Sequence, residues 1–158
     1  MSLDGREFRN ALGRFATGVC VITATNAQGK AVGMTANSFS SVSLAPPLVL
    51  WCLQNGSEVY DAYSAPGSFA INVLALEQED LSNFYAKKGD HLMEEEHYRL
   101  GRNGAPLVHN ALVNFECELE ATHEGGDHLI IVGRVLDMAS RPTGSPLLFH
   151  AGSYGEIR

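Results

Sequence analysis

The sequence predicts a mainly β protein with a few short helices, whose strands form a closed or nearly closed antiparallel barrel. Stretches rich in β-branched and apolar residues recur at strand length, and turn residues separate them. One stretch, residues 113–122, alternates between apolar and polar side chains, as expected for a strand with one face in water. The predicted strands cover residues 19–25, 31–34, 48–53, 69–74, 113–122 and 129–137.

The chain is expected to begin with an amphipathic helix over residues 4–16. Asp4 is the expected N-cap of this helix, and Gly18 follows its end. The apolar side chains that share one helical face are Phe8, Leu12 and Phe15.

The period then changes from helical to extended. Residues 19–25 and 31–34 flank a turn cluster at residues 26–29, which predicts a β-hairpin. Residues 35–43 are small and polar, and two prolines then precede the buried strand over residues 48–53.

Two further helices are predicted, over residues 57–65 and 77–87. Ser57 is the expected N-cap of the first, with Glu58 in its first turn. The inner face of the second is expected to consist of Leu81, Phe84 and Tyr85. Residues 89–106 are charged and irregular, and no element is assigned to them.

The outward face of the strand over residues 113–122 is expected to be wet. Its apolar residues would point inward, beginning with Val113. The polar side chains expected to point outward are Asn114, Glu116, Glu118 and Glu120. The next strand, residues 129–137, follows a glycine turn and is more uniformly apolar.

Size and composition indicate one domain over residues 1–158, with an ordinary globular content of 45% hydrophobic and 18% charged residues. The net charge of −7 argues against nucleic acid as a partner, because phosphate binding needs a basic surface. The three cysteines lack the spacing of a zinc site and are interpreted as buried thiols in a reducing cytoplasm. No signal segment or membrane-spanning stretch is recognised, so we expect a soluble cytoplasmic protein without a membrane partner.

The stretch most informative about function is residues 33–44, which is dominated by small and hydroxyl side chains. A strand seldom uses so many such residues unless backbone and side-chain donors approach something polar. The alternative is an edge strand and turn whose Ser and Thr residues bond to their own backbone. The spacing alone does not decide between them.

A second candidate lies at residues 52–57, where a strand end runs into a predicted helix start. Free backbone N–H groups there, with the side chains of Asn55 and Ser57, would suit a phosphate, although an ordinary capped helix has the same sequence. No arginine occurs between Arg14 and Arg99, so a phosphate held here would rely on neutral donors and a lysine.

Histidines supply the remaining candidates. Gly-Asp-His occurs at residues 89–91 and 126–128. The second copy lies in a hairpin turn, which places His128 near the sheet, whereas the first lies in the irregular segment and is assigned no role. His150 and Tyr154 lie close together near the C-terminus. The histidines do not match metal-ligand spacings, and no Rossmann or nucleophile-elbow motif is present.

Taken together, these segments resemble the flavin reductase-like family, the small FMN-binding split-barrel proteins that supply reduced flavin to two-component monooxygenases. The resemblance covers nearly the whole chain in order. It is carried by residues 16–19 (ATGV), 33–38 (GMTANS), 43–49 (SLAPPLV), 69–74 (FAINVL), 126–128 (GDH) and 150–155 (HAGSYG).

The resemblance implies a six-stranded antiparallel split barrel that works as a homodimer, with flavin near the subunit interface. By the same resemblance, the nicotinamide nucleotide would bind at His128, which is the candidate catalytic residue, with His150 and Tyr154 close to it. The residues that would bind the flavin are Met34, Thr35, Ala36, Asn37, Ser38, Cys52, Leu53, Asn55, Ser57, Phe84 and Lys88.

The implied activity is hydride transfer from NADH or NADPH to FMN or FAD, which needs the two rings stacked with the reacting atoms about 3–3.5 Å apart. Donors from residues 35–38 would stabilise negative charge on the flavin, as in an oxyanion hole. An arginine-poor site also fits modest flavin affinity, which would help reduced flavin to leave for a partner monooxygenase. The alternatives are a protein with fixed FMN that reduces another acceptor, and a non-catalytic flavin-binding protein.

Overall fold

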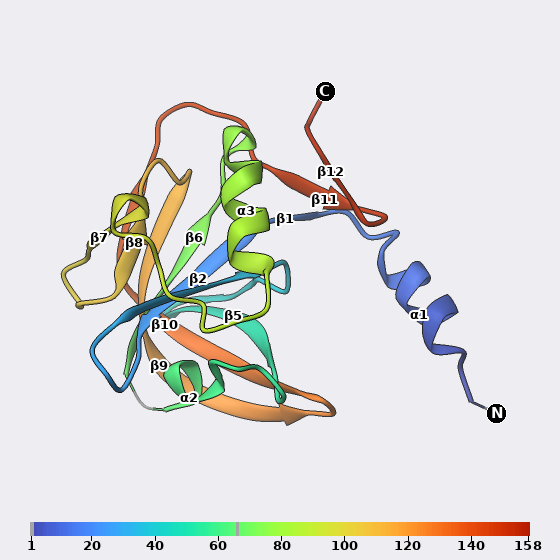
Figure 1. The fold of residues 1–158 in the computed structure, drawn as a ribbon, viewed down its shortest axis with the longest axis horizontal. Helices are drawn as coiled ribbons and strands as arrows, with labels where there is room; N and C mark the ends of the chain where they lie inside the picture. Colours follow the sequence, from blue (N-terminus) through green and yellow to red (C-terminus); the bar gives the residue numbers. More distant parts are fainter. Residues whose placement is uncertain (1, 66) are drawn as a thin grey trace.

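The computed structural model describes residues 2–65 and 67–158 and has one curved antiparallel sheet as its centre (Figure 1). The strand order is β3-β2-β6-β9-β10-β5-β4. The sheet therefore has seven strands, not six, because residues 40–44 pair with β5 as an extra edge strand. The strands are β2 (Cys20–Thr25), β3 (Ala31–Ala36), β4 (Ser40–Leu44), β5 (Pro47–Gln54), β6 (Ser68–Val73), β9 (Val113–Gly125) and β10 (His128–Ser140).

The two edge strands of this sheet, β3 and β4, are consecutive in the chain. Only residues 37–39 join them, and four residue steps span at most about 14 Å. The sheet must therefore curl until its edges approach, which makes the nearly closed barrel that the sequence predicts. Ser38 fastens the joint, because its hydroxyl oxygen accepts a hydrogen bond from the Cys52 N–H at 2.9 Å.

Two small sheets accompany the main one. The C-terminal hairpin of β11 (Leu148–His150) and β12 (Ser153–Gly155) pairs with β1 (Thr17–Gly18). A second hairpin forms from β7 (Tyr98–Leu100) and β8 (Pro106–Val108), inside and just after the segment to which no element was assigned.

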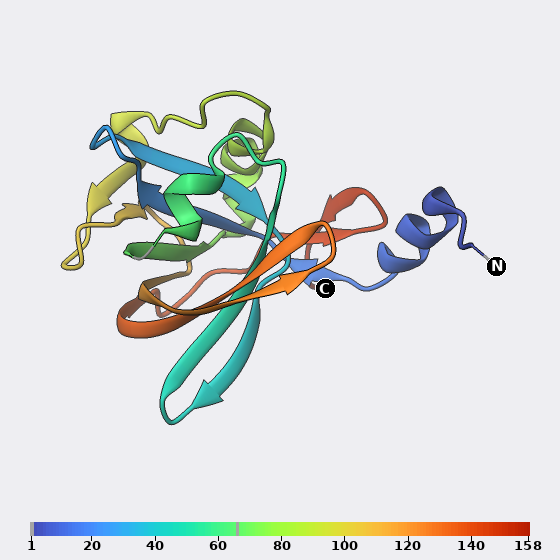
Figure 2. The ribbon, with the colours of Figure 1, turned by 90° about the horizontal axis from the view of Figure 1, so that it is seen from below.

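The first helix, α1 (Gly5–Leu12), is shorter than predicted and projects away from the barrel (Figures 1 and 2). Asp4 caps it as predicted, since its carboxylate accepts hydrogen bonds from the N–H groups of Arg6 and Glu7 at 2.9 Å. The C-cap is Gly13. No residue of α1 is buried, so its apolar face has no partner within the described chain.

The helix predicted over residues 57–65 begins later, as α2 (Tyr60–Ser64), with Val59 as its N-cap. Ser57 is thus not the N-cap; its hydroxyl oxygen accepts a hydrogen bond from the Val59 N–H at 3.3 Å within the preceding turn. The other short helices are η1 (Leu76–Gln78), α3 (Glu79–Ala86) and η2 (Glu95–His97).

The prediction for the inner face of α3 was partly wrong. Tyr85 is buried as expected, but Phe84 is 39% exposed and Ser82 is fully buried. Residues three and four apart share a helix face, so Ser82 and Ala86 lie together while Phe84 points elsewhere.

The predicted wet face of β9 is also wrong in its first half. Asn114 and Glu116 are buried because residues 98–108 fold over this face. Asn114 donates hydrogen bonds to Asn72 and to the Val108 carbonyl, and Glu116 accepts one from the Asn103 N–H at 3.0 Å. Only Glu118 and Glu120 remain exposed.

The barrel interior is apolar and closely packed around one tryptophan. Trp51 contacts Tyr63 and Phe69 edge to face, with ring centroids 5.2 and 6.3 Å apart. Its fully buried neighbours include Ile22, Leu53, Ile71 and Ile131. None of the helices formed by the described residues is both long and apolar enough to cross a bilayer.

Candidate functional site

Two cavities open along β3 and adjoin one another. One, of about 300 Å³, lies between β3, residues 54–58 and residues 85–91. The other, of about 180 Å³, lies between β3, α3 and the C-terminal hairpin. Thr35 and Ala86 line both cavities, so we treat them as one site, the β3 trough. Its lining residues are Val19, Met34, Thr35, Ala36, Asn37, Gln54, Gly56, Ser57, Glu58, Ser82, Tyr85, Ala86, Lys88, His91, Phe149 and Tyr154.

The backbone of β3 supplies one donor to this trough. Residues 91–93 cover the first half of the outer edge of β3, where the Gly33 N–H donates to the His91 carbonyl at 2.9 Å. Because N–H groups alternate in direction along a strand, the Thr35 N–H points to the same edge, beyond the end of the covering segment. This main-chain donor therefore faces the trough.

Three elements meet at the closed side of the trough, around the buried Ser82. The Tyr154 hydroxyl lies 2.7 Å from Ser82 Oγ and donates to Asn83 Oδ1 at 3.2 Å. The Thr35 hydroxyl donates to the Ser82 carbonyl at 2.7 Å. These bonds fix the C-terminal hairpin and β3 at opposite sides of one turn of α3.

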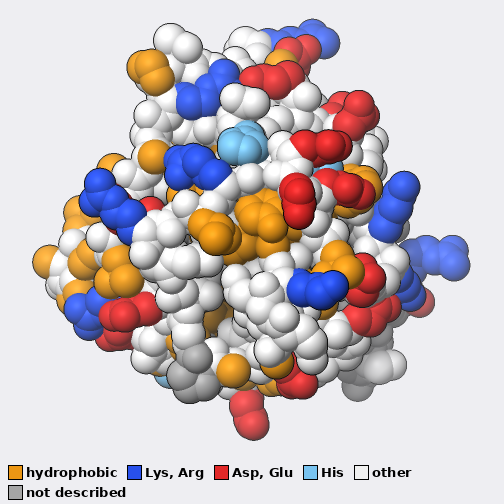
Figure 3. Space-filling model, turned by 60° about the vertical axis from the view of Figure 1, so that its left-hand side comes forward, with side chains coloured by type: hydrophobic (Ala, Val, Ile, Leu, Met, Phe, Trp, Pro, Cys, Tyr) orange, Lys and Arg blue, Asp and Glu red, His pale blue; other side chains and the backbone are white. Residues whose placement is uncertain are grey.

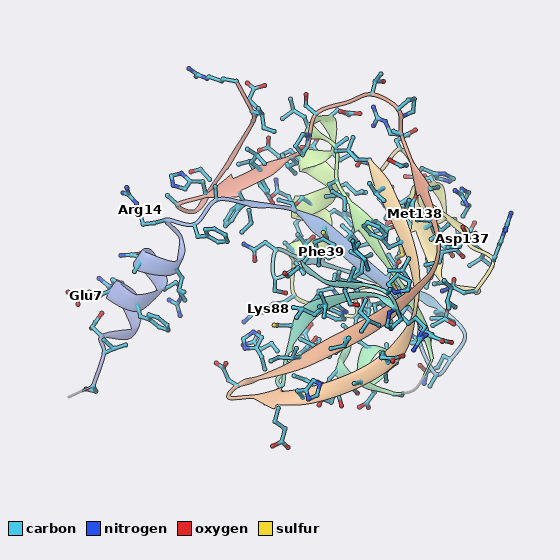
Figure 4. All side chains as sticks on the ribbon, turned by 180° about the vertical axis from the view of Figure 1, so that it is seen from behind. Glu7, Arg14, Phe39, Lys88, Asp137 and Met138 are labelled. Atoms are coloured by element: carbon cyan, nitrogen blue, oxygen red, sulfur yellow. The ribbon has the colours of Figure 1, made fainter. Side chains whose placement is uncertain are left out.

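The other end of the trough is more polar. Ser57 and Lys88 line it, together with Glu58 and His91. Lys88 is labelled in Figure 4, where it lies on the opposite side of the body from Asp137 and Met138. Lysine and hydroxyl donors at one end, and an apolar middle formed by Ala36 and Ala86, match an elongated ligand with one anionic end.

The structure brings about half of the residues assigned to flavin or nicotinamide binding into the trough. Those from the sequence-based set that line it are Met34, Thr35, Ala36, Asn37, Ser57, Lys88 and Tyr154. Ser38 and Cys52 lie beyond it, joined by the hydrogen bond between β5 and the edge connection. Burial raises the pKa of the Cys52 thiol.

Four other residues of that set do not line the trough. The Leu53 side chain is fully buried in the core, so only its backbone is available to a ligand. Asn55 holds the β9–β10 hairpin, with its side-chain amide donating to the Gly126 carbonyl at 3.3 Å. His150 is exposed on β11 and outside the lining. Phe84 lines a separate hollow of about 380 Å³ together with His97 and acidic side chains.

His128 lies beside the polar end of the trough without lining it. It is the first residue of β10 and pairs with Gln54 of β5, which does line the trough. Its Nδ1 lies 2.7 Å from Asp127 Oδ1, and this hydrogen bond lowers the pKa of the Asp127 carboxyl.

Sequence reasoning missed several residues of the trough. His91 belongs to the Gly-Asp-His copy that was assigned no role, yet its ring lines the site. Ser82 and Ala86 were missed because Phe84 was chosen for their helix face. Two small residues four positions apart among larger ones were the available signal. Glu58 was considered only as part of a helix first turn.

These features define a class of protein: a small, mainly β barrel with a ligand-sized trough along one edge strand. The chain matches the model of the flavin reductase like domain over residues 12–158. It belongs to the flavin reductase-like family.

The sequence is similar to those of individual relatives over most of their length. The chain is 45% identical over 154 residues to a protein of Agrobacterium fabrum named FMN reductase (NADH) SmoA, which covers 98% of this chain and 87% of SmoA. It is 36% identical over 157 residues to HsaB of Mycobacterium tuberculosis, named as the reductase subunit of a flavin-dependent monooxygenase, with 98% of this chain and 83% of HsaB covered.

The fold agrees as well. NADH:FAD oxidoreductase SgcE6 of Streptomyces globisporus C-1027, solved in complex with NAD and FAD fragments, superposes with a TM-score of 0.91 at 34% identity, covering 100% of this chain and 97% of SgcE6. Other matches are longer than this chain. It covers 42% of a 48% identical relative from Rhizobium meliloti (strain 1021) and 53% of a solved chain from Sinorhizobium meliloti 1021.

Proposed function

We propose that this protein is an NADH-dependent flavin reductase that reduces FMN or FAD and supplies the product to a partner flavin-dependent monooxygenase. The observation that carries the proposal is the β3 trough, with the Thr35 N–H facing it and Lys88 at its polar end. The proposal draws on the names of SmoA, HsaB and SgcE6, which describe this activity in relatives.

The trough fits a flavin by shape and by donor chemistry. Thr35 and Ala86 line both of its cavities, and these small residues leave room for a flat ring system. The Thr35 N–H faces that space and can donate to an oxygen or nitrogen at the ring edge. A bound flavin would supply the hydride acceptor, and a nicotinamide nucleotide the hydride donor.

The protein's own contribution is orientation and charge stabilisation. Donors of residues 35–37 would hold the edge of the ring on which negative charge develops, at no cost of reorganisation. At the other end, the Ser57 hydroxyl and the Lys88 ammonium would hold the ribityl chain or phosphate.

We place the nicotinamide next to the C-terminal hairpin. Tyr154 lines the cavity of the trough next to this hairpin, whereas Lys88 lines the other cavity. His150, on the same hairpin, would act from the rim at this end of the trough, and His128 from the rim at the polar end, where it pairs with Gln54. NADPH binding is favoured by an arginine at the 2′-phosphate. In the described part of the chain no arginine lines the trough, and Arg134 and Arg141 pair with Glu120 and Glu77 at 2.9 Å, so we propose NADH.

We further propose that the protein is a homodimer. Apolar side chains are exposed on α1 and just after it, on the β4–β5 hairpin and on the second half of β10, for example Phe15 at 80% and Leu44 at 96%. Figure 3 shows another face, where acidic and basic side chains are interspersed around an apolar patch. The cysteines are free thiols, which suits a reducing compartment, and on that ground we propose the cytoplasm.

The direct test is nicotinamide oxidation by the purified protein with FMN, FAD or riboflavin added, against a control without flavin, using NADH and NADPH in parallel. We expect oxidation of NADH that depends on added flavin and saturates with it. Absence of flavin-dependent oxidation would reject the proposal. Flavin that stays bound through gel filtration, with no turnover of added flavin, would instead indicate a fixed prosthetic group.

A further inference from the structure

The polar end of the β3 trough contains opposite charges. Lys88 and Glu58 both line it. The Glu58 Oε2 atom accepts a hydrogen bond from the Gly89 N–H at 2.6 Å and lies 3.7 Å from His91 Nε2. The Glu58 carboxylate therefore already accepts the hydrogen bond of the Gly89 N–H, which is next to Lys88 in the chain.

The backbone of residues 88–91 fixes this contact. Gly89 has φ +146° and His91 has φ +57°, so the chain turns sharply and directs the Gly89 N–H toward Glu58. The turn is anchored to β3 on its far side, where the Gly33 N–H donates to the His91 carbonyl and the Met93 N–H donates to the Ala31 carbonyl, both at 2.9 Å. These bonds hold the end of the turn that carries the donor against β3.

The His91 ring adds to this rigidity. Its side chain is only 9% exposed, and its Nδ1 lies 3.1 Å from the Gly33 carbonyl oxygen. The ring forms the wall between β3 and Glu58. Glu58 in turn is 47% exposed, so its carboxylate stands at the mouth, where a ligand's anionic end would arrive.

We infer that Glu58 is a specificity-determining residue that weakens the binding of phosphate-bearing flavins relative to riboflavin. This inference rests on the proposed function, because it takes the trough as the flavin site. Glu58 does so in two ways: it occupies the Gly89 N–H that a phosphate would use, and its charge offsets that of Lys88. The consequence is faster release of reduced flavin to the partner enzyme.

The size of the effect follows from exposure. Charges at a solvated mouth interact weakly because water and salt screen them, so an exposed pair changes affinity severalfold at most. A hydrogen bond to a charged group contributes somewhat more. We therefore expect about a fivefold change in phosphate-dependent affinity, not an all-or-none switch.

The test compares Kd values for FMN and riboflavin, measured by flavin fluorescence titration of the full chain. In Glu58→Gln the charge is lost while the side-chain shape is kept. We expect its Kd for FMN to fall about fivefold and its Kd for riboflavin to stay within about twofold, with the difference shrinking in about 0.5 M salt as expected for screening. Glu118→Gln, an exposed glutamate on β9 outside the trough, is the matched control and should change neither value.

Two further variants keep the test decisive. Glu58→Ala also frees the Gly89 N–H and should tighten FMN binding at least as much as Glu58→Gln. Lys88→Gln should weaken FMN binding and leave riboflavin unchanged. The inference is overturned if the glutamate variants change both flavins equally, or change neither. If the wild-type protein binds neither flavin, the proposed function itself fails, which is a distinguishable result.

Discussion

At the scale of single residues, the site depends on small side chains that make few but well-defined bonds. Ser82 is fully buried, and its hydroxyl and carbonyl are hydrogen-bonded to Tyr154 and Thr35 respectively. Ser82 thus connects, through its hydrogen bonds, the strand proposed to hold the flavin and the hairpin proposed to hold the nicotinamide. Catalysis by orientation tolerates little displacement, so we expect this contact to matter for nicotinamide binding as well as for folding.

Removing the Tyr154 hydroxyl tests that expectation. In Tyr154→Phe the hairpin loses its bonds to Ser82 and Asn83, so we expect the KM for NADH to rise about fivefold, the flavin Kd to change less than twofold, and the free energy of unfolding to fall by about 1 kcal/mol. Steady-state kinetics and urea unfolding measure these quantities. Tyr98→Phe on β7, outside the trough, is the control. A flavin Kd that rises as much as KM would place the hydroxyl at the flavin instead.

At the scale of elements, the β7–β8 hairpin is held onto the sheet by polar bonds. Asn72 on β6 is fully buried, and its side chain donates to the Val21 carbonyl at 2.9 Å and to Thr23 Oγ1 at 3.0 Å. Its Oδ1 accepts from the Val108 N–H at 3.0 Å and from Asn114 at 2.7 Å. One side chain therefore joins β2, β6, β8 and β9.

Asn72→Ala should lower the free energy of unfolding by about 4 kcal/mol, since several buried polar groups would lose their partner at about 1–3 kcal/mol each. For a domain of this size the melting temperature would fall by roughly 10 °C. Urea and thermal unfolding provide the measurement. Asn10→Ala on the exposed α1 serves as the control and should have little effect. Equal stability of Asn72→Ala would mean that the hairpin is not held by this network.

At the scale of the whole molecule, α1 and the β4–β5 hairpin extend from the barrel (Figures 1 and 2). Leu12, the last residue of α1, is 59% exposed, and Phe15, three residues after the helix ends, is 80% exposed. A free-standing helix of this length is not stable in water without packing, and an exposed apolar face of this kind is typical of an interface. In a symmetric dimer both copies of each such side chain, one from each subunit, are buried at the interface.

Leu12→Ser combined with Phe15→Ser should therefore weaken self-association about a hundredfold. Burying one apolar side chain contributes about 1.5 kcal/mol, and each subunit loses two of them. The sum is reduced because these side chains are buried only in part. Light scattering after gel filtration over a range of concentrations measures the mass, and circular dichroism checks that the barrel persists. Arg9→Ser, on the same helix, should leave the mass unchanged. Variant and wild type of equal mass at every concentration would exclude α1 from the interface.

Much of this protein could be predicted from its residues. The hairpin of β2 and β3, the strands β5, β6 and β10, the Asp4 cap and the position of α3 follow from local periodicity and turn chemistry, which neighbours in sequence determine. The small polar residues at the end of β3 and just after it were identified as a candidate ligand-binding strand, although composition left an ordinary edge strand equally open. Local rules did not reveal that residues 98–108 cover the first half of β9, so Glu116 was expected to face water.

Sequence alone determined that the chain is a mainly β barrel of the flavin reductase-like type, because strand periodicity and the order of its motifs are written in consecutive residues. Only the tertiary structure decided which side chains share the trough: Ser82 and Ala86 rather than Phe84, His91 as well as the neighbourhood of His128, and Glu58 opposite Lys88. The physical reason is that a site depends on distances between elements far apart in the chain. Those distances depend on how strongly the sheet curls and on which face α3 turns toward it, and no local pattern encodes either.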